Sequence, residues 1–244
     1  MLTAEERTQL RELGYLCYEA LIHGEKLAHY VAVFDELVER AQTQEQDAHW
    51  TFEKGAGGAI RPERILHKIQ GVCYVEPRVL ELAREPEITQ RVAAILGDNL
   101  DIFGTKFFPL LPNGGTSTFW HQDNYYFDTE TERLITCGIY LQDADIENGC
   151  LKVIPGSHKR GRFEHRPDPT TYGGWVDVDE SEAVHLEVPA GTVLLFSGNL
   201  LHSANPNVSD RTRYSTAWHY IPGDMSLPPF ERDRYPDRHV VLGS

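Results

Sequence analysis

A histidine and an aspartate two positions apart, His121 and Asp123, are the first residues of this chain whose types and spacing could support chemistry. On a β-strand, side chains two apart point to the same face, so an imidazole and a carboxylate would lie side by side. One distant histidine would complete a set of two imidazoles and one carboxylate. Such a set suits octahedral Fe(II), because it leaves positions open for a co-substrate and dioxygen. We expect His202 to be that histidine, which predicts catalytic metal ligands at His121, Asp123 and His202.

The spacing of the first pair is a weak signal by itself. The chain has 11 histidines and 37 acidic residues, so His-x-Asp pairs arise by chance. The ordinary alternative is a polar strand face that carries a hydrogen-bonded imidazole. The rest of the pattern therefore decides the interpretation.

A second stretch, further along the chain, has the pattern of two strands joined by a turn. Its first part, Gly191–Ser197, is apolar enough for a buried strand, and its last part is strand-like again. The turn-rich segment between them would centre a hairpin between Asn207 and Val208. In that register His202 lies opposite Arg213, and directly opposed residues have Cβ atoms about 5 Å apart.

An arginine in that position could hold one carboxylate of a ligand whose other end binds the metal, because its guanidinium forms a rigid bidentate fork. A five-carbon dicarboxylate such as 2-oxoglutarate spans such a gap. Arg211, Arg213 and Ser215 share one strand face, so the pattern alone does not separate the two arginines. The cross-strand register favours Arg213. The alternative is a pair of surface arginines on an edge strand.

Longer blocks of sequence carry a family resemblance. They are Phe119-Trp120-His121-Gln122-Asp123, the run from Gln142 to Lys159 that contains Glu147-Asn148-Gly149-Cys150-Leu151 and Ile154-Pro155-Gly156-Ser157-His158-Lys159, and His202 with Arg213 eleven residues later. In this order they resemble the phytanoyl-CoA dioxygenase family of Fe(II)/2-oxoglutarate-dependent oxygenases. The second block is very specific, and the resemblance covers nearly the whole chain, most strongly from about Ile102 to Tyr220.

The resemblance implies a double-stranded β-helix fold, one ferrous iron, and oxidative decarboxylation of 2-oxoglutarate to succinate and carbon dioxide. Lys68 matches a family lysine that contacts the co-substrate, and Ile102 matches a position, often methionine, that packs against it. With Arg213, Tyr140 and Ser215, these residues form the expected cofactor-binding set. The implied cofactor and co-substrate are Fe(II) and 2-oxoglutarate.

Two positions depart from the family pattern. Gly138 stands where several relatives carry a tryptophan beside 2-oxoglutarate, and Ala204 stands where they carry a serine two residues after the distal histidine. Both departures concern the co-substrate pocket and leave the metal set intact. Tyr140, Ser203 or Ser215 could compensate for them.

Tyr125, Tyr126 and Trp175 are candidates for the substrate cavity, with packing inside the barrel as the alternative for each. The expected partners are a small-molecule substrate and dioxygen. The expected reaction is hydroxylation of an unactivated C–H bond in a small metabolite or natural-product intermediate. His158 belongs to the Pro-Gly-Ser-His-Lys turn, and neither it nor His165 is expected to bind the metal.

Two other function classes remain open. A His/Asp/His set also binds zinc, which would make the protein a redox-inert hydrolase or lyase, but Arg213 and Lys68 would then have no role. The other class is a non-catalytic barrel that binds a small ligand, and an intact metal set argues against it. Halogenation goes with loss of the metal carboxylate in relatives, so Asp123 disfavours it.

The composition of the chain restricts the kinds of partner that the protein could bind. The 244 residues carry a formal net charge of −14, which argues against nucleic acid or an anionic membrane, because both favour a basic face. No apolar run is long enough for a transmembrane span, and the N-terminal residues are acidic and polar. The four cysteines show no Cys-x-x-Cys spacing and are expected to be reduced thiols, which favours a cytoplasmic protein.

The elements that must position these residues are expected to be helical before about residue 97 and β-rich after it. Thr3-Ala4-Glu5-Glu6 has the capping-box form that begins a helix, and Gly14 would end it. Further helices are predicted at Glu25–Gln42 and Glu87–Leu96, with a loop from Trp50 to Arg64 between them. Strands are predicted at Ile102–Leu110, Leu134–Gln142, Leu151–Ile154, Ala183–Val188, Thr192–Phe196 and Thr212–Ile221.

We therefore predict a mainly β fold with an α-helical N-terminal part, in which a double-stranded β-helix (jelly-roll or cupin-like) barrel is flanked by helices. One domain is expected to span residues 1–244. It divides into a helical part of about 1–97, a jelly-roll core of about 100–222, and a tail of 223–244 that covers the barrel mouth or stays mobile.

Overall fold

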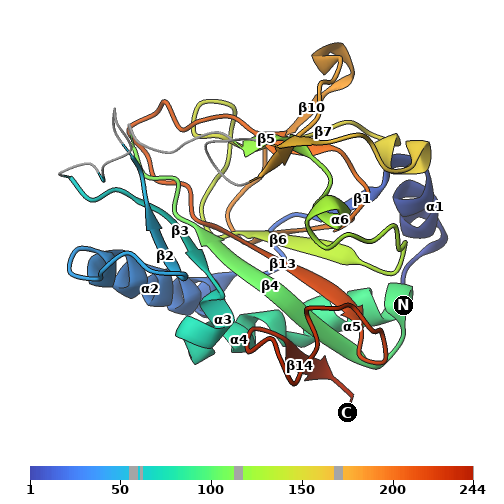
Figure 1. Cartoon of the computed structure of the whole chain (residues 1–244), viewed down its shortest axis with the longest axis horizontal. Helices are drawn as coiled ribbons and strands as arrows, with labels where there is room; N and C mark the ends of the chain where they lie inside the picture. Colours follow the sequence, from blue (N-terminus) through green and yellow to red (C-terminus); the bar gives the residue numbers. More distant parts are fainter. Residues whose placement is uncertain (55–59, 61–62, 113–117, 168–172, 244) are drawn as a thin grey trace.

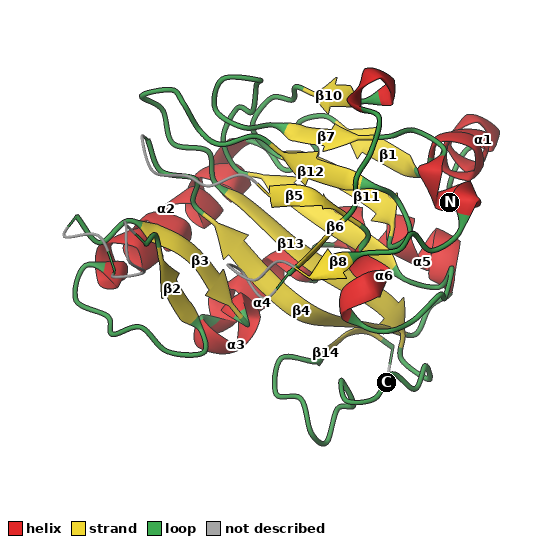
Figure 2. Ribbon diagram, turned by 45° about the horizontal axis from the view of Figure 1, so that its top comes forward, coloured by secondary structure: helices red, strands yellow, loops and turns green. Residues whose placement is uncertain are grey.

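Two antiparallel β-sheets of unequal size organise the part of the chain that this computed structural model describes, residues 1–54, 60, 63–112, 118–167 and 173–243 (Figures 1 and 2). The larger sheet has the order β1 (Tyr15–Tyr18), β11 (Thr192–Ser197), β6 (Ile135–Tyr140), β13 (Ser215–Pro222), β4 (Leu100–Phe108), β3 (Leu66–Gln70) and β2 (Trp50–Phe52), and β14 (His239–Leu242) also pairs with β4. The smaller sheet has the order β10 (Val184–Leu186), β7 (Leu151–Val153), β12 (His202–Ala204) and β5 (Thr118–His121). A separate ribbon consists of β8 (Arg166–Pro167) and β9 (Gly174–Trp175).

The helices begin and end at residues with clear local signals. They are α1 (Ala4–Leu13), α2 (Gly24–Ala41), α3 (Val72–Val75), α4 (Pro77–Ala83), α5 (Pro86–Leu96) and α6 (Asp123–Tyr126), with 3-10 turns η2 (Ser157–Arg160) and η3 (Glu180–Glu182). Thr3 caps α1 in the predicted capping box, and Gly14 ends it in the left-handed conformation at φ 87°. Pro86 begins α5, where its missing N–H costs no intrahelical bond.

The core lies between the larger sheet and helices α2, α4 and α5, which cover one face of it (Figure 1). Alternate residues of the central strands enter this layer, among them Ile139 of β6 and Trp218 and Tyr220 of β13, all fully buried. Burying an aliphatic or aromatic side chain of this kind contributes about 1.5–3 kcal/mol. The residues between them point the opposite way, toward the smaller sheet, because strand side chains alternate. The helical layer thus stabilises the sheet and leaves its other face free for a site.

The predicted mainly β fold with a helical N-terminal part is confirmed. The predicted loop from Trp50 to Arg64 is wrong in its first part, because β2 forms there and pairs with β3. Trp50 is fully buried and fixes this strand in the core. Residues 55–59 and 61–62 of the same stretch lie outside the described residues.

The predicted hairpin register is also wrong, because β12 and β13 belong to different sheets. His202 pairs with His121 of β5 and with Val153 of β7, not with Arg213. The segment between the two strands is held by other parts of the chain instead. For example, Asn207 donates from Nδ2 to the carbonyl of Leu110 at 2.7 Å. These contacts make the segment cross from one sheet to the other.

The tail is attached to the edge of the larger sheet over residues 223–243. β14 pairs with the first half of β4, while β3 pairs with its second half. Asp101 of β4 is fully buried and binds two tail arginines, Arg232 and Arg238, each with an N–O distance of 2.7 Å. This cluster of three charges secures the tail against β4.

Two simpler expectations concern the whole described chain. Across the described ranges, no helix combines the length and apolarity that crossing a bilayer requires. Cys17, Cys73, Cys137 and Cys150 are all free, as predicted.

Asp101→Ala should destabilise the protein by about 3 kcal/mol, because it removes the nearer carboxylate partner of the buried Arg238 guanidinium and leaves only Glu231, at 3.3 Å. Urea unfolding measures the change. Asp233→Ala is the control, because Asp233 forms only an exposed pair with Arg234, and it should cost less than about 1 kcal/mol. Equal losses in the two variants would show that the buried cluster does not secure the tail.

Candidate active site

The three predicted ligands meet at one point between the sheets. His121 is the last residue of β5 and His202 the first of β12, and cross-strand pairing sets their ring centroids 4.2 Å apart. Asp123 completes the group, and the candidate ligand atoms of all three residues lie within 4.8 Å of one another. All three side chains are buried.

Asp123 reaches this point by a different route from the one predicted. It does not lie on a strand with His121 but begins the short helix α6. The intervening residue, Gln122, fixes the turn: its N–H donates to Nε2 of His165 at 3.0 Å, and its Oε1 accepts the N–H of Phe163 at 2.8 Å. Its Nε2 also donates to the carbonyl of Asn199 at 2.7 Å. Gln122, between the two candidate ligands, is therefore held by its backbone and its side chain to two other segments of the chain.

Backbone carbonyls select the tautomers of both histidines. Nδ1 of His121 donates to the carbonyl of Phe119 at 2.7 Å, and Nδ1 of His202 donates to the carbonyl of Leu200 at 2.9 Å. A carbonyl can only accept, so the proton of each neutral ring lies on Nδ1. Each Nε2 lone pair is then free, and each Nε2 lies 3.7 Å from an oxygen of Asp123. This orientation of outer hydrogen bonds is typical of histidines that bind a metal.

A directed chain of hydrogen bonds supports Asp123 from the larger sheet. The hydroxyl of Thr136 donates to Asp123 Oδ2 at 2.7 Å, because an ionised carboxylate can only accept. Thr136 Oγ1 must then accept from Nδ1 of His219 at 3.1 Å, which leaves Nε2 of His219 to accept from Nζ of Lys106 at 3.1 Å. The carboxylate thus fixes the proton positions of all three partners.

Burial and the neighbouring charges keep the set in its metal-binding protonation state. Burial alone would raise the pKa of Asp123, but the imidazoles of His202, His219 and His121 outweigh it and hold the pKa well below its ordinary value. Burial, reinforced by His121 and opposed by Asp123, lowers the pKa of His202 to about 4. At neutral pH the site therefore presents an ionised carboxylate at Asp123 and a neutral imidazole at His202, the forms that coordinate metals.

The structure groups Arg213 with two of the residues predicted to hold the co-substrate. Its guanidinium is buried, donates from Nη1 to Ser215 Oγ, and lies 5.4 Å from the ring centroid of Tyr140. Its Nε has no hydrogen-bond partner in the described chain. A buried, unused donor is costly unless a ligand accepts from it. Lys68 lies on β3, and burial together with the charge of Lys106 lowers its pKa to about 8.

The prediction that Ile102 packs against the co-substrate is wrong. It packs in the core cluster on the helix-covered face of the larger sheet, so it cannot contact a ligand on the other face. The residue of β4 that extends toward the metal set is Lys106. Ser203 does not compensate for Ala204 either, because its hydroxyl donates to the carbonyl of Thr118. Gly138 faces the site, and a Cβ added there would meet only the carbonyl of Thr216, at 3.7 Å.

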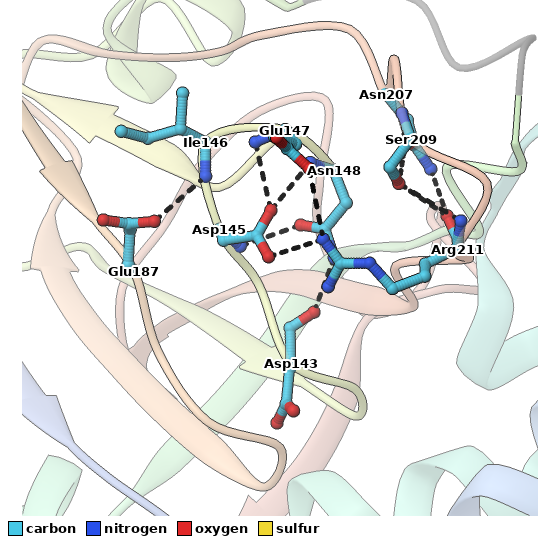
Figure 3. A network of polar contacts seen from close by, with 9 residues as sticks. All are labelled: Asp143, Asp145, Ile146, Glu147, Asn148, Glu187, Asn207, Ser209 and Arg211. Atoms are coloured by element: carbon cyan, nitrogen blue, oxygen red, sulfur yellow. Dashed lines mark hydrogen bonds and ion pairs between the residues drawn. The ribbon is translucent and has the colours of Figure 1, made fainter.

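The structure also separates the two arginines, although not by the predicted register. Arg211 lies at the surface, where its Nη2 is 2.6 Å from Oδ2 of Asp145 (Figure 3). Asp145 Oδ1 accepts the N–H groups of Glu147 and Asn148, so the Glu-Asn-Gly-Cys block forms a capped turn. Gly149 is required in that turn, because a Cβ would lie 2.6 Å from the carbonyl oxygen of Asn205. This specific motif therefore supports the crossing segment and does not contact the metal set.

The three aromatic candidates occupy different places. The ring of Tyr126 lies 5.4 Å from that of His121 and is partly exposed, so it borders the metal set. Tyr125 stacks on His165 with ring centroids 4.2 Å apart, which is a packing role. Trp175 lies on β9, with the guanidinium of Arg166 5.1 Å from its ring centroid.

Thr136, His219 and Lys106 were not among the predicted site residues. A partial signal for them was present, because each is a polar residue in a strand that also contributes several buried apolar side chains. Such residues alternate onto the face opposite the core, where they need a partner. Without knowing which strands pair, the partner could not be named.

Comparison with known proteins identifies the family. The family model for phytanoyl-CoA dioxygenase matches residues 10–215. The chain belongs to the phytanoyl-CoA dioxygenase family. It is 32% identical over 198 residues to a phytanoyl-CoA dioxygenase domain-containing protein 1 homolog from Dictyostelium discoideum, covering 75% of this chain and 70% of that protein. It is 26% identical over 215 residues to a probable alpha-ketoglutarate-dependent hypophosphite dioxygenase from Stutzerimonas stutzeri, covering 84% and 74%.

Solved structures share the fold. EctD from S. alaskensis, determined with 2-oxoglutarate and 5-hydroxyectoine, superposes with a TM-score of 0.75 at 21% identity, covering 96% of this chain and 81% of that one. The family match and the His-Asp-His set agree on the class of enzyme. The protein is a non-haem iron dioxygenase that depends on 2-oxoglutarate, with Fe(II) as its metal.

Thr136→Val should weaken Fe(II) binding about 10- to 100-fold, because it removes the donor that orients Asp123. Anaerobic equilibrium dialysis measures the affinity. Thr216→Val is the matched control, since its buried hydroxyl has no partner in the described chain and its loss should leave Fe(II) affinity unchanged. Equal effects would show that the bond to Asp123 has no role in metal binding.

The metal-free protein should lose stability as the pH falls below about 6.5, where imidazoles titrate in the unfolded chain. Burial lowers the pKa of His219 to about 3 and that of His202 to about 4, so the unfolded state binds more protons in this range. Each buried histidine should cost about 2 kcal/mol between pH 7 and pH 5. Urea unfolding of the wild type and of His219→Phe measures the difference. If the variant keeps the full pH dependence, His219 is not buried as a neutral ring.

Proposed function

We propose that this dioxygenase hydroxylates an unactivated C–H bond of a small metabolite or natural-product intermediate and releases succinate and carbon dioxide. The observation that carries the proposal is the convergence of His121, Asp123 and His202 with a buried arginine, Arg213, on the same side of the larger sheet. Without such an arginine, the same His-Asp-His set would fit a zinc enzyme equally well.

The spacing between the metal set and Arg213 suits 2-oxoglutarate. Thr136, which binds Asp123, pairs with His219 of β13, and Ser215, which binds Arg213, lies four residues earlier on the same strand. At roughly 3.3 Å per residue, the positions of His219 and Ser215 along β13 are about 13 Å apart. A five-carbon diacid, with its metal bonds at one end and the arginine side chain at the other, fits that interval.

Each residue then has a definite task. Arg213 and Ser215 would bind the far carboxylate, with Lys68 as a second cation beside it. The Nε donor of Arg213, which has no partner in the described chain, supports this fit. Tyr140 would line the same pocket, because its ring lies against the guanidinium. These contacts orient the co-substrate so that its other end faces the metal ligands.

When bound, ferrous iron with dioxygen and 2-oxoglutarate supplies the oxidising power, which no side chain here can provide. The chain contributes orientation and exclusion of water, for which the buried position of the three ligands is suited. Tyr126 borders the metal set and is the best placed of the aromatic candidates to contact the substrate. Trp175, on β9, and Tyr125, which stacks on His165, would line the substrate cavity further from the metal set.

The remaining expectations belong to the same proposal. We infer that the two sheets close as a double-stranded β-helix, that residues 1–244 act as one domain, and that the protein works in the cytoplasm on a small molecule, without nucleic acid. The redox-inert zinc enzyme is the second candidate, because the same ligands bind zinc. It offers no role for the unsatisfied guanidinium of Arg213.

Asp123→Ala should abolish succinate formation from 2-oxoglutarate in the absence of substrate, because the carboxylate anchors and neutralises the metal. Succinate is measured after anaerobic loading with Fe(II) and exposure to air. Undiminished turnover would overturn the assignment of Asp123, and a wild type that gives neither succinate nor visible absorption with Fe(II) would favour the zinc alternative.

Arg213→Ala should raise the concentration of 2-oxoglutarate required for half-maximal turnover by about tenfold or more, as expected for loss of a charge-assisted bond. Arg211→Ala is the matched control, because Arg211 is exposed and already paired with Asp145. The reverse order of effects would place the co-substrate at the surface arginine and contradict the proposed pocket.

A further inference from the structure

Strand β4 carries a β-bulge in its middle. Its pairing with β13 shifts by one residue between Phe103 and Lys106. Gly104 and Thr105 therefore lie opposite a single residue of β13, Trp218. Gly104 adopts the left-handed conformation, at φ 60°, which a glycine commonly takes as the first residue of a bulge. A bulge of this kind redirects the side chains that follow it.

The bulge decides which face of the larger sheet Lys106 occupies. On a regular strand, residues an odd number of positions apart point to opposite faces. Phe103 and Lys106 are three apart, yet both lie against His219, with ring centroids 5.5 Å apart for Phe103 and an Nζ–Nε2 distance of 3.1 Å for Lys106. Ile102 and Phe107 are five apart, and both lie in the helix-covered core. Without the extra residue, alternation would turn Lys106 toward that core and Phe107 toward the metal set.

The tail supplies the groups that satisfy the bulge. Thr105 is fully buried, and its N–H donates to Asp237 Oδ2 at 2.7 Å while its hydroxyl donates to Asp237 Oδ1 at 2.6 Å. The carbonyl of Thr105 accepts the N–H of Gly71 at 2.6 Å. Asp237 is itself buried, and the chain after it is fixed to β4, because Arg238 binds Asp101 and β14 begins at the next residue. Removal of the Asp237 carboxylate would leave two buried donors of the bulge without their acceptor, which is costly.

Asp237 also influences the charge of Lys106. Burial lowers the pKa of Lys106, and the carboxylates of Asp123 and Asp237 oppose that effect. The ammonium of Lys106 bonds to His219, in the chain of hydrogen bonds that reaches the metal set. A cation in that position attracts 2-oxoglutarate, which is a dianion. Asp237 therefore favours both the orientation and the charged form of Lys106 that the co-substrate requires.

Building on the proposed function, we propose that Asp237 is a positioning residue for the active site. Its carboxylate bonds to Thr105, which belongs neither to the metal set nor to the group around Arg213. It acts through the bulge, which directs Lys106 into the co-substrate pocket. Asp237 lies beyond residue 215, where the match to the family model ends, so the tail contributes to a site whose other residues lie within that match.

Binding of 2-oxoglutarate to the anaerobic Fe(II) protein, followed by the visible metal-to-ligand absorption, tests this role. Lys106→Met should raise the dissociation constant of 2-oxoglutarate about tenfold, as expected for loss of a charged partner. Asp237→Ala should raise it about threefold or more, because Lys106 is no longer held on the face toward the metal set. In the double variant it should stay within about twofold of the value for Lys106→Met alone, because Asp237 acts through Lys106.

Asp233→Ala is the control for the tail, because Asp233 forms only an exposed pair with Arg234, and it should leave the affinity unchanged. Urea unfolding shows that each variant is folded under the conditions of the titration. If Asp237→Ala fails to fold, Asp237→Asn takes its place in the comparison, because the amide removes the charge and one of the two acceptors.

Three results would overturn the proposal. The first is a change of less than about threefold in Asp237→Ala, and the second is a pair of losses that multiply in the double variant, as they do for independent residues. The third is a weaker band with an unchanged dissociation constant, which would show that Asp237 only stabilises the fold. The wild-type band and the effect of Arg213→Ala test the proposed function separately. If both are as expected while Asp237→Ala has no effect, only the positioning role is rejected.

Discussion

The hydrogen bond from Thr136 to Asp123 joins the two sheets at the point where the three candidate metal ligands meet. Asp123 follows a strand of the smaller sheet, and Thr136 lies in the middle of the larger one. A buried carboxylate must be satisfied or it destabilises the fold, so this bond, together with the surrounding imidazoles, sets how the sheets approach each other. The remaining geometry follows from it. His121 and His202 are aligned by strand pairing, and their carbonyl partners turn both Nε2 atoms toward the same carboxylate.

The site is polarised from one end to the other. Near the metal the carboxylate of Asp123 provides negative charge, whereas the charged side chains described in the pocket beyond it, Lys68, Lys106 and Arg213, are cationic. This division explains why the buried arginine and lysines persist without carboxylate partners, since ligands rather than protein groups balance them. The small residues Gly138 and Ala217 contribute by leaving space between the two ends.

Local signals in the sequence predicted the long helices and six of the strands, because helix caps and periodicity are properties of neighbouring residues. The candidate metal ligands came from the His-x-Asp spacing together with the family resemblance, and Asp123 reaches the others from α6 and not from a strand. Predictions that depended on which strands, distant in the sequence, pair with each other were less accurate. The register of His202 against Arg213 was wrong because β12 and β13 lie in different sheets, and the segment between them bonds to Leu110 as well as within its own turn. Ile102 was placed in the pocket from a resemblance, although strand alternation puts it in the core. His219 was missed because its role depends on Lys106, more than a hundred residues earlier.

The way β4 is completed has a consequence for the order of folding. One half of its outer edge pairs with β3, which precedes it closely, but the other half waits for β14 at residues 239–242. During synthesis the outer-edge backbone groups of Leu100 to Ile102 therefore stay unpaired until β14 leaves the ribosome, and the buried charge of Asp101 stays unpaired until Arg232 and Arg238 do. An open strand edge next to an apolar core is prone to join other chains. Nascent molecules interrupted before β14 should accordingly depend on chaperones far more than the finished protein does.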